Sequence, residues 1–173
     1  MIVKGQRLTE EHRVFQPKYL EGLLGAISAG FFLIVIGAFF VVTPNLFDKI
    51  LDFFKDFDIA RLPNSSIIYW PAPARPWAHT VLYSVVTHFC LVWGIFQIII
   101  LAMRFFASSP LSKKAETASN IVFWLGAFYL GNRFLTSTTT LETWFVFWAT
   151  IIMLAGVSLI IRAAVLATKS FTQ

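Results

Sequence analysis

The side chains best suited to chemistry inside a membrane lie on one predicted helix, residues 77–104. At about 100° per residue its polar positions fall on a single broad arc, which includes Tyr83, Ser84, Thr87, His88 and Gln97. A histidine at depth can hold an ion or relay a proton, so this arc could line a polar cavity or a path for a small ligand. Hydroxyl and amide groups also join membrane helices through hydrogen bonds. We favour that structural role, because no second titratable residue lies at depth near His88.

A second group, His79, Tyr83 and Arg133, would have to carry the chemistry if the protein were an enzyme of the membrane interface. The sequence lacks the HExxH, CxxC, Walker-type glycine loop and GxSxG motifs. A haem held between facing helices needs two histidines at depth, and this chain has one. The sequence therefore predicts no catalytic residue, no metal and no cofactor.

The composition indicates that these residues are positioned by helices in a bilayer. Hydrophobic residues make up 57% of the chain and the mean hydropathy is +0.72, which would leave a soluble protein with unburied apolar surface. Crossing a hydrocarbon core of roughly 30 Å takes about 20 apolar residues. Four uncharged runs approach that length: 23–42, 81–103, 117–132 and 143–161. The third is short and must use Glu116 and Arg133 as end residues at the interface.

We therefore predict an all-α, polytopic integral membrane protein, built as one membrane domain over residues 1–173. Its core is a four-transmembrane-helix bundle with an additional amphipathic helix between the first and second spans. The predicted segments are a cytoplasmic N-terminal segment 1–19, a span at 20–43, the amphipathic helix at 44–58, an external proline-rich loop at 59–76, a span at 77–104, a cytoplasmic turn at 105–109, a span at 110–135, an external turn at 136–139, a span at 140–166 and a cytoplasmic tail at 167–173.

The amphipathic segment divides cleanly into an apolar and a charged face. Its apolar face includes Leu46, Phe47, Ile50, Leu51, Phe54 and Phe57. The segment is too short and too charged to span, so it should either lie flat in the outer interface or cap the bundle. The aspartates at positions 48, 52 and 56 share the other face, but adjacent lysines favour a solvated surface over a cation site.

The loop that follows this helix, 59–76, contains Pro63, Pro71, Pro73 and Pro76. Proline interrupts helices and removes backbone donors from strand pairs. We therefore expect an irregular external cover here.

The strongest helix-packing signal lies in the first span. Small residues recur on one face at intervals of three to four: Gly22, Gly25, Ala26, Ala29 and Gly30. Such a face lets helix backbones approach closely, which drives association where lipid offers no hydrophobic gain. The partner helix could come from this chain or from another, and we favour packing within the chain.

The distribution of positive charge predicts the orientation, because lysine and arginine resist translocation. One side of the predicted membrane carries Lys4, Arg7, Arg13, Lys18, Arg104, Lys113, Lys114, Arg162 and Lys169. The other side has fewer basic residues, and aspartates offset them. We expect a multi-pass protein of the cell membrane with both termini cytoplasmic. The net charge of +5 follows from this bias and from attraction to the lipid bilayer, so no nucleic-acid partner is predicted.

These observations predict a small non-catalytic membrane protein that acts as a structural or accessory subunit. It would pack against itself, as a homo-oligomer, or against a larger membrane complex. The alternative is an oligomeric channel or facilitator for a small neutral or weakly polar solute, lined by the polar arc. A membrane-interface enzyme is the third reading.

Overall fold

The computed structural model describes residues 17–62 and 67–168, and the predicted terminal segments 1–19 and 167–173 lie largely outside this range. In chain order, the elements are α2 (Pro17–Val42), α3 (Leu46–Lys55), β1 (Phe57–Arg61), β2 (Tyr69–Pro73), the 3₁₀ helix η1 (Pro76–His79), α4 (Thr80–Phe106), α5 (Leu111–Phe134) and α6 (Leu141–Ala167). The fold is therefore mostly helical, and the long helices fall on the four predicted ranges.

Among the described residues, three helical segments are long and apolar enough to cross a membrane. They are Tyr19–Val42, Pro76–Phe106 and Leu141–Ala167. The fourth long helix, α5, does not qualify, because its first three turns carry polar residues such as Lys113, Glu116 and Asn120. The three apolar helices are compatible with a membrane-embedded protein, while a bundle of four spans is not confirmed.

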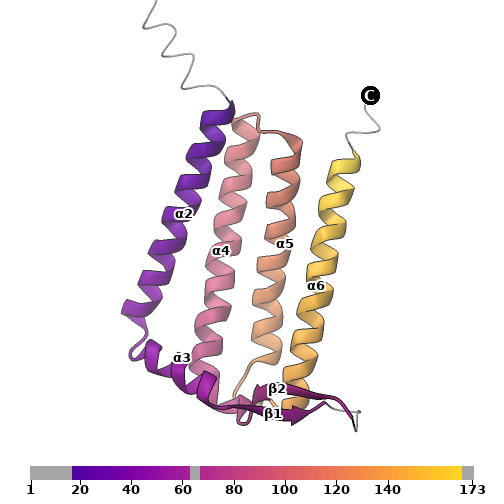
Figure 1. The fold of residues 1–173 in the computed structure, drawn as a ribbon. Helices are drawn as coiled ribbons and strands as arrows, with labels where there is room; N and C mark the ends of the chain where they lie inside the picture. The colour runs from indigo at the N-terminus through magenta and orange to yellow at the C-terminus, as the bar shows by residue number, and fades with distance from the viewer. Residues whose placement is uncertain (1–16, 63–66, 169–173) are drawn as a thin grey trace, which may run out of the picture.

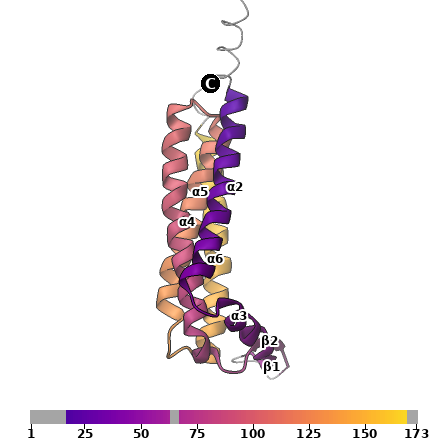
Figure 2. The same cartoon turned by 90° about the vertical axis from the view of Figure 1, so that its left-hand side faces the viewer.

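The long helices stand side by side in the order α2, α4, α5 and α6 (Figure 1). The view at 90° places α4 and α5 mainly on one side and α2 and α6 on the other, so the row is curved (Figure 2). We call the end with α3, β1, β2 and η1 the hairpin end. The opposite end, where α2 and α5 begin and α4 and α6 finish, is the terminal end.

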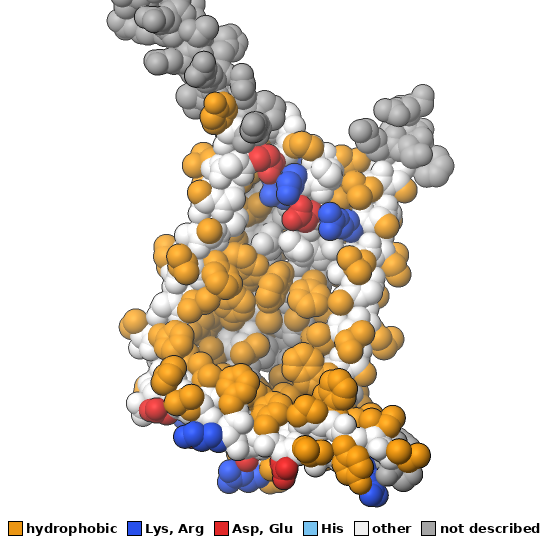
Figure 3. Space-filling view, in the orientation of Figure 1, with side chains coloured by type: hydrophobic (Ala, Val, Ile, Leu, Met, Phe, Trp, Pro, Cys, Tyr) orange, Lys and Arg blue, Asp and Glu red, His pale blue; other side chains and the backbone are white. Residues whose placement is uncertain are grey.

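The surface matches this arrangement. On the face shown in Figure 3, hydrophobic side chains cover the middle of the molecule, and charged side chains gather toward the two ends. The same face is hollowed between α2 and α6. A broad apolar belt between polar ends is the surface expected of helices that contact lipid.

Three glycines close the seams between α4, α5 and α6. A Cβ added to Gly94 of α4 would lie 2.6 Å from Leu125 of α5, and one added to Gly126 of α5 would lie 2.6 Å from Leu154 of α6. At Gly131 of α5 the added atom would lie 2.6 Å from the hydroxyl of Thr87 in α4. At each of these glycines, a side chain of the neighbouring helix therefore occupies the space that a Cβ would need.

The short elements at the hairpin end differ from the predicted irregular loop. Asn45, with a left-handed φ of 54°, turns the chain out of α2 and into α3. Strands β1 and β2 pair antiparallel, with Phe57 opposite Pro73 and Arg61 opposite Tyr69. The expectation of an irregular cover is wrong for these residues, and the two short strands add a hairpin to a mostly helical fold. Proline is tolerated because both strands of a two-stranded sheet are edge strands, where a missing amide hydrogen can face outward.

A larger side chain at a glycine in a helix seam should destabilise the protein more than the same substitution at a glycine with no neighbouring atoms. Gly131→Val should lower the free energy of unfolding by about 1–3 kcal/mol more than Gly156→Val, because overpacking forces neighbours out of place. Gly156 of α6 has no atom within 4 Å of an added Cβ, which makes it a matched control. Unfolding of both variants in mixed micelles would measure the difference, and equal losses would contradict this account of the seams.

Candidate functional site

An aromatic cluster joins the hairpin end to the long helices. The Phe53 ring of α3 lies 5.1 Å from His79, 6.2 Å from Tyr83 and 6.0 Å from Trp144, measured between ring centroids. Tyr83 and Trp144 are buried together with Ala72 of β2. Edge-to-face pairs of this kind add to the free energy gained by burial. The cluster holds α3, the hairpin, α4 and α6 in fixed positions.

Asp56, the residue after α3, connects this cluster to the start of α4. Its carboxylate accepts hydrogen bonds from His79 Nε2 at 2.9 Å, from Arg75 Nε at 2.9 Å and from the Arg75 main-chain amide at 2.8 Å. Its own carbonyl accepts a bond from the Ala74 amide at 2.8 Å. The Asp56 side chain is only 5% exposed and that of His79 9%. Asp56 is therefore a buried carboxylate with its hydrogen-bonding capacity in use.

This environment changes the acidity of Asp56. Burial alone would raise the pKa of the carboxyl, but the hydrogen bonds from His79 and Arg75 outweigh burial and lower the pKa below its ordinary value of 3.8. The charged form is thus favoured in the folded protein. The prediction that the aspartates lie on a solvated face is wrong for this residue, because the side chain of Asp56 points to η1.

A charged pocket of about 340 Å³ opens beside Asp56, between α3, η1 and the first turn of α4. Its polar lining is formed by Lys49, Asp52, Lys55, Asp56, Arg75 and His79. Arg75 is 67% exposed. Within the described part of the chain, Lys49 and Lys55 make no ion pair or side-chain hydrogen bond. The pocket therefore offers cationic groups whose hydrogen-bond donors are available.

The predicted polar arc of α4 is divided between two surroundings. Tyr83, Thr87 and Gln97 are buried between helices, whereas Ser84 and His88 are exposed. His88 Nδ1 lies 2.7 Å from the Ser84 carbonyl oxygen and 3.3 Å from the Ser84 hydroxyl. The prediction that the polar arc lines the bundle interior is therefore wrong for Ser84 and His88. The seam with α5 covers a narrower arc of α4 than the polar pattern does.

The apolar face of α3 is also divided, into two parallel rows. Leu46, Ile50 and Phe57, with Phe53, turn toward the other helices and are buried or half-buried. Phe47, Leu51 and Phe54 are exposed, Phe54 at 67%. The helix therefore caps the hairpin end with one row and leaves the other row free. The buried row fits the predicted capping role, while the predicted position of the exposed row in the membrane interface stays a prediction.

The small-residue face of α2 makes no close contact within the chain. All five predicted positions, Gly22, Gly25, Ala26, Ala29 and Gly30, are exposed. An added Cβ at Gly22, Gly25 or Gly30 would meet nothing within 4 Å. The prediction that this face packs inside the chain is therefore wrong. The opposite face of α2, with Leu24 and Phe31, packs on Phe96 and Ile100 of α4.

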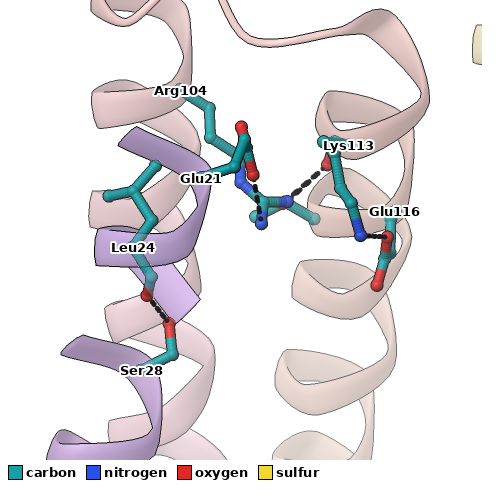
Figure 4. Close-up of polar contacts among 7 residues, drawn as sticks. Glu21, Leu24, Ser28, Arg104, Lys113 and Glu116 are labelled. Carbon is teal, nitrogen blue, oxygen red and sulfur yellow. Dashed lines mark hydrogen bonds and ion pairs between the residues drawn. The ribbon is translucent and has the colours of Figure 1, made fainter. Parts of the chain in front are cut away.

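A polar cluster that the sequence reasoning missed ties α2 to the terminal end (Figure 4). Arg104 of α4 lies between α2 and α5: its Nη2 is 3.4 Å from Glu21 Oε2, and its Nη1 donates to the Lys113 carbonyl at 2.6 Å and to the Thr117 hydroxyl. Lys113 also pairs with Glu116 at 3.0 Å. The Glu21–Arg104 ion pair could have been predicted, because the two oppositely charged residues fall on the same side of the predicted membrane.

The group expected of an interface enzyme is assembled only in part. His79 and Tyr83 have ring centroids 6.4 Å apart, but Arg133 forms no ion pair or hydrogen bond with either among the described residues. The Tyr83 hydroxyl is buried without a hydrogen-bond partner there. Within 17–62 and 67–168, no group of three or more His, Cys, Asp or Glu side chains could hold a metal ion.

Comparisons of this chain with protein-family models, with curated proteins and with solved structures found no match.

Asp56→Asn should weaken the hairpin end and remove its acid sensitivity. A hydrogen bond to a charged group contributes about 1.5–3 kcal/mol, so the variant should unfold about 2 kcal/mol more easily at pH 7. Because the folded-state pKa is lowered, the stabilisation is fully present above pH 3.8 and is lost as the pH falls below that value.

The measurement is the free energy of unfolding of the wild type and of Asp56→Asn, from pH 7 down to pH 3. The difference between the two proteins should shrink at the acid end. A difference that stays constant across this range would show that the Asp56 charge does not stabilise the fold.

Proposed function

We propose that this protein is a small non-catalytic membrane subunit that acts by packing the small-residue face of α2 against a helix of another chain. The observation that carries the proposal is the exposure of that whole face, whereas Gly94, Gly126 and Gly131 each have a side chain of a neighbouring helix packed against them. The partner would be a second copy or a subunit of a larger complex.

All four long helices should cross the cell membrane, with both termini on the cytoplasmic side. In support, α5 lies between two apolar helices, α4 and α6, and has a similar length. Its polar first turns lie at the terminal end, where Lys113, Glu116 and Arg104 would meet headgroups. The excess of lysine and arginine on that side supports a cytoplasmic location.

The surroundings of α2 support a role in association. Apolar rings hold it to α4, with the centroids of Phe31 and Phe96 4.0 Å apart, and the Glu21–Arg104 ion pair holds its first turns. These contacts use one side of the helix only. Lipid fills a small-residue surface poorly, whereas a second helix can approach its backbone closely and gain dispersion energy.

A second candidate is an oligomeric facilitator for a small neutral solute, favoured by the exposed pair Ser84 and His88 on α4. Polar groups facing lipid are costly, so a second copy that covers them would be favourable. At the centre of such an oligomer they would line a polar path.

Gly25→Leu should release the partner without unfolding the chain. A leucine at this open position blocks the approach of another backbone, and that close approach is the contact on which small-residue helix pairs depend. Tagged protein extracted from its own host in mild detergent should co-purify with a stoichiometric partner. Gly25→Leu should not, and Gly156→Leu, an equally open glycine on α6, should behave like the wild type. A wild type that is monomeric and alone would refute the proposal.

For the second candidate, the test is solute flux in reconstituted vesicles. His88→Leu should abolish glycerol-driven swelling of proteoliposomes, while Ile99→Leu on the same exposed side of α4 should not. Vesicles that swell no faster than protein-free ones would remove this function.

A further inference from the structure

We propose that the charged pocket at the hairpin end and the apolar groove next to it form one binding site for a phospholipid, with the phosphate in the pocket and hydrocarbon in the groove. The proposal requires a membrane setting but not the partner of α2. It assigns a ligand to a part of the molecule that the association of α2 does not use.

The phosphate half of the site rests on available cationic donors. Lys49 and Lys55 of α3 and Arg75 before η1 border the same 340 Å³ space. Arg75 uses only its Nε on Asp56, which leaves both terminal nitrogens for another anion. Ammonium and guanidinium groups form their strongest hydrogen bonds with phosphate and carboxylate oxygens.

The carboxylates of the pocket do not cancel this charge. Asp56 is occupied by His79 and Arg75, and the Phe53 ring packs against the same histidine. Asp52 is the remaining acid in the lining. The lining therefore carries three cationic side chains against two carboxylates, which leaves an excess of one positive charge that favours an anion.

The hydrocarbon half is an apolar groove between α2, α3 and α4. It has a volume of about 180 Å³, and its lining includes Ile36, Phe39, Leu46, Ile50, Val86 and Phe89. None of its lining residues is charged. Covering this apolar surface with hydrocarbon would remove it from water, which is favourable.

The two spaces are neighbours along α4. Leu82 borders both the charged pocket and the apolar groove, and Val81 borders the pocket one residue earlier. The groove then continues down α4 to Val85, Val86 and Phe89, toward the middle of the apolar belt. A charged pocket next to an apolar groove matches a molecule with a phosphate at one end and an acyl chain at the other. Free phosphate would leave the groove empty.

The test uses the purified full chain, stripped of lipid in a sugar-based detergent, and three probes. They are phosphatidylglycerol, diacylglycerol, which has the chains without the phosphate, and inorganic phosphate. Binding is measured by native mass spectrometry and by the shift of the unfolding midpoint. Phosphatidylglycerol should bind at least about tenfold more tightly than either other probe, since both halves of the site contribute.

Two pairs of substitutions locate the binding. Lys49→Gln with Lys55→Gln should weaken phosphatidylglycerol binding by about tenfold or more, because two charge-assisted contacts are lost. Lys113→Gln with Lys114→Gln removes the same charge at the terminal end, outside the pocket lining, and should weaken binding much less than the first pair does. Circular dichroism confirms that both proteins are folded. Val86→Trp, which fills the groove, should weaken lipid binding without changing any binding of inorganic phosphate.

Three outcomes would overturn the proposal. Equal affinity for phosphatidylglycerol and diacylglycerol would remove the phosphate site. Equal losses in the two lysine pairs would make the attraction a general effect of charge. Inorganic phosphate that binds as tightly as the lipid, and that depends on Lys49 and Lys55, would assign the pocket to free phosphate. Failure of the α2 partner to appear would affect none of these measurements.

Discussion

Helices surrounded by hydrocarbon gain little from burying apolar side chains against one another, so they must hold together by close backbone approach and by specific polar and aromatic contacts. In this protein, side chains of the neighbouring helix pack directly against Gly94, Gly126 and Gly131 and so join α4, α5 and α6. The central helix, α5, is the least apolar of the four and still packs between two apolar ones. Packing of side chains at these glycines therefore joins α5 to both of its neighbours, although α5 is less apolar than they are.

The same constraint explains why α2 differs from the others. Its contacts with α4 come from large rings and from one ion pair with Arg104, while its glycines and alanines face away. The chain thus contains two kinds of small-residue surface, one closed by its own side chains and one open. At the hairpin end, Asp56 and the Phe53 cluster fix α3 across the long helices. That arrangement creates both the charged pocket and the groove beside it.

The long helices could be predicted from sequence because uncharged runs and their ends mark them directly. The partner of each helix face could not be predicted from sequence. A helical wheel shows which residues share a face, but not which residues that face contacts. The regular spacing of Gly22, Ala26 and Gly30 pointed to an internal seam, whereas Gly126 and Gly131, which form real seams, follow no such repeat. Asp56 and His79 are separated by 23 positions, and their pairing depends on a hairpin that the prolines argued against.

The most direct test of the central claim is photocrosslinking in the native membrane from position 33, which lies on the open face of α2. Leu33 is 68% exposed and is large enough to be replaced by a benzophenone-bearing residue without filling the glycine surface. Position 160, where Ile160 of α6 is 69% exposed, provides the comparison. We expect a single protein adduct of defined mass from position 33 and none from position 160. Adducts with lipid alone from both positions would show that α2 has no partner and would contradict the proposed function.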